Sequence, residues 1–156
     1  MINKSRQEQL IKLAQKEAEK AIQEGNVPFG AVLTDSLGGI VVVAHNTQIS
    51  SNDPIAHAEI NLLRRAGKKL KSRYLDGCRV FGNAAPCSMC VSACIKAHIR
   101  HFYYGASPEK TMDPWITVFD LAKKSKRKIY IYPNILKESS ERQIKEGREK
   151  ITKGKY

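Results

Sequence analysis

Two short stretches, HAE at residues 57–59 and PCSMC at residues 86–90, decide the fold and the chemistry of this chain. The first offers one imidazole, and the second offers two cysteine sulfurs with two residues between them. Such a set holds a zinc ion on three sides and leaves the fourth tetrahedral position for water, as in catalytic rather than structural zinc sites. The predicted zinc ligands are therefore His57, Cys87 and Cys90.

Both motifs fall where a helix is expected to begin. Residues 56–66 and 88–97 have apolar side chains at helical spacing, and Pro86 stands just before the second run. Amides at a helix N-terminus carry partial positive charge, which lowers thiol pKa values and favours thiolates that bind a cation. Glu59 is not needed as a ligand, so we expect its carboxylate to take a proton from water and return it to a leaving amine.

The rest of the chain alternates between helical and extended patterns. A Ser5–Glu8 capping box is expected to start the first helix. The expected further helices are residues 5–24, 115–123 and 136–151, and the expected strands are residues 31–35, 40–44, 78–81, 99–104 and 128–132. Without repeats or a low-complexity linker, this pattern predicts a single α/β domain over residues 1–156, with helices packed around one sheet.

Composition limits the class of protein. With 156 residues, of which 42% are hydrophobic and 27% charged, the chain is long enough to bury one core. The first residues contain no apolar segment typical of a secretory signal, and no run approaches the roughly 18 residues that cross a bilayer. We therefore expect no membrane association and a cytoplasmic location. The four cysteines lie within residues 78–94, where metal binding or burial is more plausible than a disulfide framework.

Charge is distributed unevenly along the chain. Residues 1–60 carry five Lys/Arg and seven Asp/Glu, whereas residues 61–156 carry 22 and eight. This positive excess could attract phosphates, so a nucleic-acid partner has to be considered. The alternative is that the lysines only solvate helix surfaces, since they are dispersed and interleaved with Glu.

Two further cysteines have open roles. Cys94 lies one helical turn after Cys90 and could complete a closed four-ligand site, which would make the zinc structural. Its neighbours are apolar, which favours a small buried residue instead. Cys78, in an expected strand, is interpreted in the same way.

On these motifs the chain resembles the cytidine deaminase-like superfamily of zinc deaminases, from the first expected helix to residue 128. The resemblance implies a three-layer α/β/α sandwich around a five-stranded mixed sheet, assembled as a homodimer or a tetramer, of which we expect the homodimer. It implies Zn²⁺ as the cofactor, bound by His57, Cys87 and Cys90. It also implies that Glu59 is the proton shuttle in the hydrolysis of an exocyclic amine.

Within the superfamily, the chain is most similar to bacterial guanine deaminases and related purine-base or nucleoside deaminases. The matching segments are VPFGAVL at 27–33, Asn46, SNDPIAHAEI at 51–60 and YLDGC at 74–78. The resemblance implies release of ammonia from guanine or a related small purine, with hydroxide on the zinc as the nucleophile.

The same resemblance implies further site residues. Asn46 would contact the substrate, Asp113 would assist proton transfer, and Tyr156 would close over the pocket. Phe29 is a candidate wall beside the base. Each has a structural alternative: Asn46 could cap a turn, Asp113 could cap the next helix, Phe29 could be ordinary core, and Tyr156 could be a frayed terminus.

Other functions stay open. tRNA adenosine deaminases share the DPxAHAE and PCxxC motifs and a basic C-terminal helix, here residues 135–155, which would make tRNA the partner. A cytosine or cytidine-type substrate is a third possibility. A fourth is an RNA-binding module that keeps the zinc only as scaffold, although Glu59 would then have no role.

Overall fold

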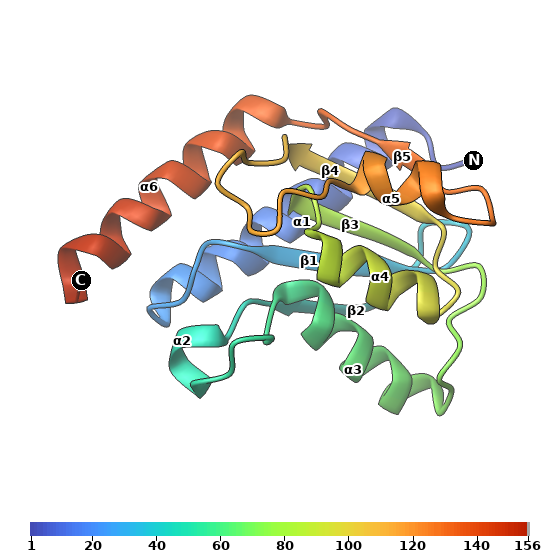
Figure 1. Cartoon of the computed structure of the whole chain (residues 1–156), viewed down its shortest axis with the longest axis horizontal. Coiled ribbons are helices and arrows are strands. Elements are labelled where there is room, and N and C mark those ends of the chain that lie inside the picture. The colour runs from blue at the N-terminus through green and yellow to red at the C-terminus, as the bar shows by residue number, and fades with distance from the viewer. Residues whose placement is uncertain (156) are drawn as a thin grey trace.

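The computed structural model describes the backbone of residues 1–155 and the side chains of residues 1–151. Its strands form one mixed sheet in the order β2-β1-β3-β4-β5 (Figure 1). They are β1 (Gly30–Thr34), β2 (Ile40–His45), β3 (Arg79–Ala84), β4 (His101–Ala106) and β5 (Tyr130–Tyr132). β1 pairs antiparallel with β2 and β3, whereas β3, β4 and β5 run parallel. The predicted five-stranded mixed sheet is confirmed.

Helices cover both faces of this sheet, which confirms the three-layer sandwich (Figure 1). One face carries α1 (Lys4–Gln23) and α6 (Lys137–Lys155), and the other carries α3 (Ala58–Leu70), α4 (Ser88–Lys96) and α5 (Val118–Lys124). A single turn, α2 (Gln48–Ser51), follows β2. Within residues 1–155, no helix combines the length and the apolar character that a membrane crossing requires.

The sheet separates two apolar cores. The core facing α3 and α4 receives alternate residues of the central strands, Leu33, Val80 and Phe102. The core facing α1 receives their neighbours Val32, Phe81 and Tyr103. Because both faces are covered, β1 is buried along its whole length, and its sequence is continuously apolar from residue 31 to residue 33 instead of alternating.

The start of α1 differs from the sequence prediction. The side chain of Asn3 accepts a hydrogen bond from the backbone amide of Arg6 at 2.9 Å, so Asn3 caps the helix and Lys4 is its first residue. The predicted Ser5–Glu8 capping box is therefore wrong.

The start of α5 also differs. Thr117 and Asp120 form a capping box, so the helix begins at Val118 and not at residue 115. Asp113 lies outside the helix, and its interpretation as the helix cap is wrong. Other ends differ by a few residues, and the short α2 was not predicted.

Pairing of the strands places the starts of α3 and α4 at one edge of the sheet. Gly30 pairs with His45 near the end of β2, and Ala31 pairs with Gly82 near the end of β3. The chain therefore leaves β2 and β3 at the same edge. α4 connects β3 to the parallel β4, so its N-terminus lies at the carboxyl end of β3, where α/β proteins place their sites.

Gly30 gives a test of this packing. A Cβ atom there would lie 2.1 Å from the carbonyl oxygen of Ala14 and 2.5 Å from the amide nitrogen of Ala18, both on the backbone of α1. We expect Gly30→Ala to lower the free energy of unfolding by about 1–3 kcal/mol through overpacking, measured by urea denaturation. The control is Gly67→Ala in α3, where the nearest atom is 3.4 Å away and Ala should be neutral or stabilising. Equal stability of the two variants would contradict the close contact of β1 with α1.

Candidate active site

The three predicted zinc ligands converge in space. His57 and Cys87 are the cap residues that precede α3 and α4, and Cys90 lies in the first turn of α4. Nδ1 of His57 lies 3.5 Å from Sγ of Cys87 and 3.5 Å from Sγ of Cys90. All three donor atoms lie within 4.8 Å of one another.

These separations fit a tetrahedral zinc ion. Zn–S and Zn–N bonds of about 2.3 and 2.0–2.1 Å at a tetrahedral angle place nitrogen and sulfur roughly 3.5 Å apart. Among the side chains of residues 1–151, this group contains three donors, so one tetrahedral position is left for water. The donor set of one imidazole and two thiolates thus suits a catalytic rather than a closed structural site.

The electrostatics of the cysteine pair favour a cation. A hydrogen bond from the thiol of Cys90 lowers the pKa of Cys87 to about 4, and His57 contributes in the same direction. The pKa of Cys90 is correspondingly raised, because its proton is held by Cys87 and its side chain is buried. One thiolate is therefore present at neutral pH before metal arrives, and zinc would replace the proton of the other.

Cys94 is not part of the ligand group. It is completely buried, and burial raises the pKa of its thiol well above the usual range, so it stays protonated. The structure therefore favours a packing role for Cys94, and Cys78 is buried as well.

Glu59 lies beside the ligands without joining them. It is in the first turn of α3, two residues after His57, and its side chain is only 8% exposed. Burial raises the pKa of the Glu59 carboxyl, because the ionised form loses its hydration. A carboxyl in this state can both accept and release a proton.

A cavity of about 450 Å³ opens next to these groups. Its volume is in the range of small-molecule sites. The predicted site residues that line it are Phe29, Asn46, His57, Glu59, Cys87 and Asp113. Cys90 is fully buried behind this surface, and Tyr156 lies outside the described residues. The structure thus brings together, around one cavity, residues that lie more than 80 positions apart in the sequence.

Asn46 caps a turn, the structural alternative considered for it, and it also lines the cavity. Its side-chain oxygen accepts a hydrogen bond from the Gln48 amide at 2.9 Å, and its Nδ2 donates to Oε1 of Gln48 at 2.7 Å. It therefore organises the turn that starts α2. It is also buried in the cavity wall, where its amide offers both a donor and an acceptor.

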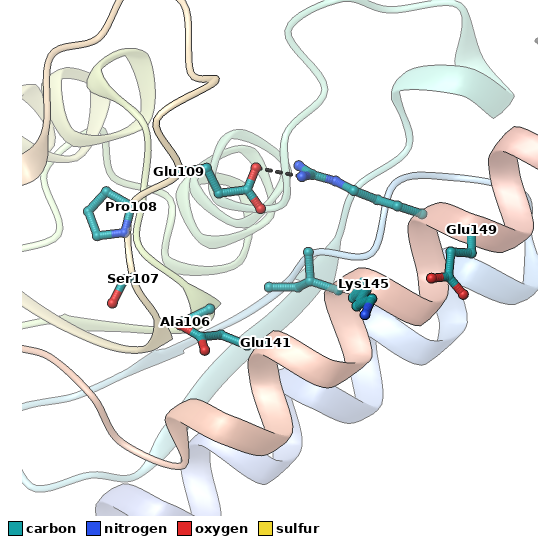
Figure 2. Close-up of a pocket in the computed structure, with 9 residues that line it drawn as sticks. Ala106, Ser107, Pro108, Glu109, Glu141, Lys145 and Glu149 are labelled. Carbon is teal, nitrogen blue, oxygen red and sulfur yellow. Dashed lines mark hydrogen bonds and ion pairs between the residues drawn. The ribbon is translucent and has the colours of Figure 1, made fainter.

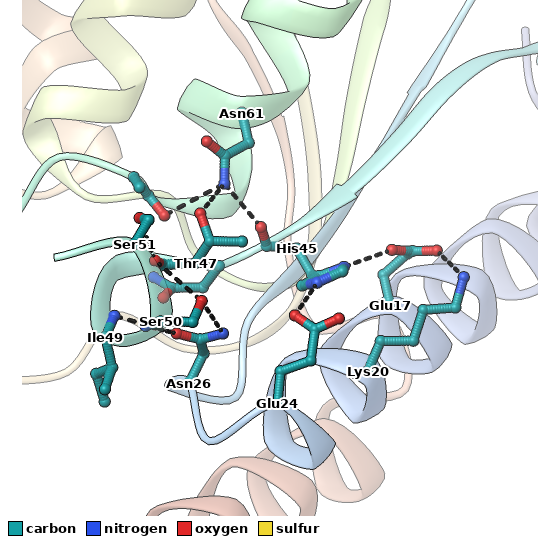
Figure 3. A network of polar contacts seen from close by, with 12 residues as sticks. Glu17, Lys20, Glu24, Asn26, His45, Thr47, Ile49, Ser50, Ser51 and Asn61 are labelled. Carbon is teal, nitrogen blue, oxygen red and sulfur yellow. Dashed lines mark hydrogen bonds and ion pairs between the residues drawn. The ribbon is translucent and has the colours of Figure 1, made fainter. Parts of the chain in front are cut away.

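A polar network fixes this wall to the zinc-binding helix (Figure 3). Nδ2 of Asn61, on α3, donates to the backbone oxygen of His45 at 2.9 Å and to Oγ1 of Thr47 at 3.0 Å. The imidazole of His45 also bonds Glu17 of α1 at 3.0 Å and Glu24, the residue that caps the end of α1, at 2.8 Å. Both neighbours of Asn46 are thereby tied to α3, the helix that carries Glu59. The sequence prediction missed Asn61, although its place on α3 four residues after His57 is a usable signal.

Other lining residues were also missed. Gln48 follows Asn46 closely, and Met89 lies inside the PCSMC motif. Glu109 and Arg148 form an ion pair at the cavity, and the Arg148 guanidinium carbon lies 5.5 Å from the centre of the Phe29 ring. No sequence pattern indicates this contact, because Arg148 reaches the site from α6, far along the chain.

Comparisons with known proteins agree with this chemistry. Residues 4–106 match the family model of the cytidine and deoxycytidylate deaminase zinc-binding region. The chain is 35% identical to a tRNA-specific adenosine deaminase of Aquifex aeolicus over 103 residues, 66% of this chain and 68% of that protein. It is 36% identical to a guanine deaminase of Bacillus subtilis over 117 residues, 75% of this chain and 68% of that protein.

A solved structure is also similar. It comes from biochemical and structural studies of A-to-I editing by tRNA:A34 deaminases at the wobble position of transfer RNA. It matches with a TM-score of 0.78 and 29% identity, covering 86% of this chain and 98% of the other.

The ligand set can be tested by zinc binding. We expect Cys87→Ala and Cys90→Ala each to weaken zinc affinity by more than about 100-fold, since removal of a direct ligand should exceed the effect of outer-shell changes. Affinity is measured by competition with a chelator. Cys94→Ala is the matched control and should bind zinc like the wild type, because Cys94 lies outside the ligand group. Zinc lost from Cys94→Ala but kept by Cys90→Ala would overturn the assignment.

Proposed function

Because the chain belongs to the family defined by the cytidine and deoxycytidylate deaminase zinc-binding region, and is a zinc-dependent hydrolytic deaminase of a nucleobase or nucleoside amine, we propose that its substrate is a free purine, with guanine as the first choice. The observation that carries this choice is the cavity of about 450 Å³ beside the zinc ligands, whose lining offers carboxylates, an amide and an aromatic ring to a planar base.

The charges of the cavity suit a neutral base better than a phosphate chain. Its lining contains three carboxylates, Glu59, Glu109 and Asp113, against the single guanidinium of Arg148. Carboxylates accept hydrogen bonds from ring and exocyclic N–H groups, of which guanine has several, but they repel phosphate. The aromatic face of Phe29 adds an apolar surface on which a planar ring can stack.

Each residue then has a role in the reaction. Zinc, when bound by His57, Cys87 and Cys90, supplies an activated water at neutral pH. Glu59 takes a proton from that water and delivers it to the departing amine. Asn46 orients the ring through its amide.

Two assignments are more peripheral. Asp113 lies in the cavity wall and would exchange a proton or a hydrogen bond with the substrate. Tyr156 would close the pocket from the C-terminus.

The alternative substrate is adenosine in tRNA. It is favoured by the similarity to the Aquifex aeolicus protein and to the tRNA deaminase structure, and by the excess of basic residues after residue 60. The same zinc and the same Glu59 would serve either substrate, so the two proposals differ in what enters the cavity.

We also propose a cytoplasmic homodimer. Trp115, Ile116 and Phe119 are 49%, 41% and 43% exposed in one short segment near the cavity. Exposed apolar residues grouped in this way are typical of interaction surfaces, and a second copy would cover them.

The substrate proposal predicts ammonia and xanthine from guanine. We expect Glu59→Gln, which keeps the side-chain shape but cannot carry the proton, to lower kcat by about 10²–10⁴-fold. The measurement is a coupled ammonia assay with metal-loaded protein. A zinc titration of Glu59→Gln serves as the control and checks that the variant still binds metal. No release of ammonia by the wild type above the Glu59→Gln level would refute guanine as substrate.

Binding and editing of tRNA separate the two substrates. Under the free-purine proposal we expect no inosine in tRNA incubated with the protein, and only weak retention of tRNA that disappears between about 50 and 200 mM salt, as for non-specific phosphate contacts. Nucleoside analysis and filter binding provide the measurements, with Glu59→Gln as the editing control. Inosine formed by the wild type alone would favour the tRNA function instead.

A further inference from the structure

A second hollow adjoins the cavity of the candidate active site. It is a groove of about 550 Å³ between the loop after β4 and the exposed side of α6 (Figure 2). The groove and the cavity share three lining residues, Ser107, Glu109 and Arg148. The two spaces are therefore neighbours, and these shared residues form the partition between them.

The partition is closed by one ion pair. Nη1 of Arg148, on α6, bonds Oε2 of Glu109, in the loop after β4 (Figure 2). The guanidinium also lies over the ring of Phe29, which is the aromatic wall of the cavity. The pair thus joins α6 to both the loop and the base-binding wall, and it ends the cavity on that side.

Both partners of this ion pair reach solvent. The side chain of Arg148 is 43% exposed and that of Glu109 is 34% exposed. Charges in contact with water lose little free energy when they separate, because solvent replaces the partner. The rest of α6 stays in place, since Gly147 packs against Pro28 and Ile22, and Ile144 is buried.

The groove beyond the pair has the chemistry of a sugar site. Glu141 and Lys145 lie one turn apart on α6, and Ser107, in the loop after β4, also lines the groove (Figure 2). Carboxylate, ammonium and hydroxyl groups together accept and donate hydrogen bonds to vicinal hydroxyls. The carboxylates disfavour a phosphate at the same place.

We propose that the Glu109–Arg148 pair is a gate that restricts the cavity to a free purine base, and that the groove behind it takes the ribose of a purine nucleoside when the pair opens. This inference rests on the proposed function for its choice of ligand. Selection between base and nucleoside is then set by α6 and the loop after β4, away from the zinc ligands.

The test compares guanosine with guanine. Arg148→Met keeps the side-chain stem over Phe29 but breaks the ion pair, and Glu109→Gln breaks it from the other side. We expect both variants to raise the ratio of kcat/KM for guanosine to that for guanine by about tenfold or more. The matched control is Arg142→Met, an exposed arginine on the same helix that lines neither space, and its ratio should equal that of the wild type. An unchanged ratio in Arg148→Met and Glu109→Gln would overturn the gate.

A second measurement does not depend on the substrate. 1,10-Phenanthroline is a planar three-ring chelator, so its access to the zinc reports the width of the entrance. We expect phenanthroline to remove zinc several-fold faster from Arg148→Met than from the wild type or Arg142→Met. The zinc that remains on the protein is measured by metal analysis after gel filtration. A small chelator such as glycine should show no such difference.

The two measurements separate two failures. If the wild type acts on neither guanine nor guanosine, the proposed function fails, while the phenanthroline rates still decide on the gate. The gate would be overturned if phenanthroline removed zinc equally fast from Arg148→Met and the wild type. It would also be overturned if both chelators removed zinc faster from Arg148→Met.

Discussion

The approach of His57 to Cys87 and Cys90 joins the N-termini of α3 and α4 at one edge of the sheet, and the site is built around this contact. The donors come from two helices that follow different strands, so their separation is set by the pairing of β1 with both β2 and β3. The helices are held against the sheet by the core between them. Both cysteines and the histidine lie where backbone amides stabilise negative charge, which favours thiolates as ligands.

The same convergence leaves Glu59 buried next to the metal position. A carboxyl is costly to ionise there, and a raised pKa of this kind is common among groups that exchange protons at active sites. The polar network through Asn61 and His45 adds a second constraint, because it ties the chain beside Asn46 to α3, the helix that carries Glu59, and both residues line the same cavity. Asn46 and Glu59 are therefore linked through the contact of β2 with α3.

The residues that line the cavity lie on both sides of the end of the family match. The match to the deaminase family ends at residue 106, and it contains His57, Glu59 and both cysteine ligands. Glu109, Asp113 and Arg148 all come after it. The chain is 35% identical to the tRNA-specific adenosine deaminase and 36% identical to the guanine deaminase, and the portion that matches the family model contains the zinc-ligand group and Glu59.

Local sequence was sufficient for the ligands, the proton-shuttle candidate, the strand and helix order and the three layers, because short-range patterns and one motif pair carry that information. It also indicated a cavity role for Asn46 and Phe29. It failed where a nearby side chain competed for a cap, as at Asn3 and Thr117, and it missed Arg148 entirely. Arg148 meets Phe29 only because α6 folds back across the face of the sheet that carries α1. Contacts between residues so far apart leave no periodic trace in the sequence, so only the tertiary structure decided what closes the cavity.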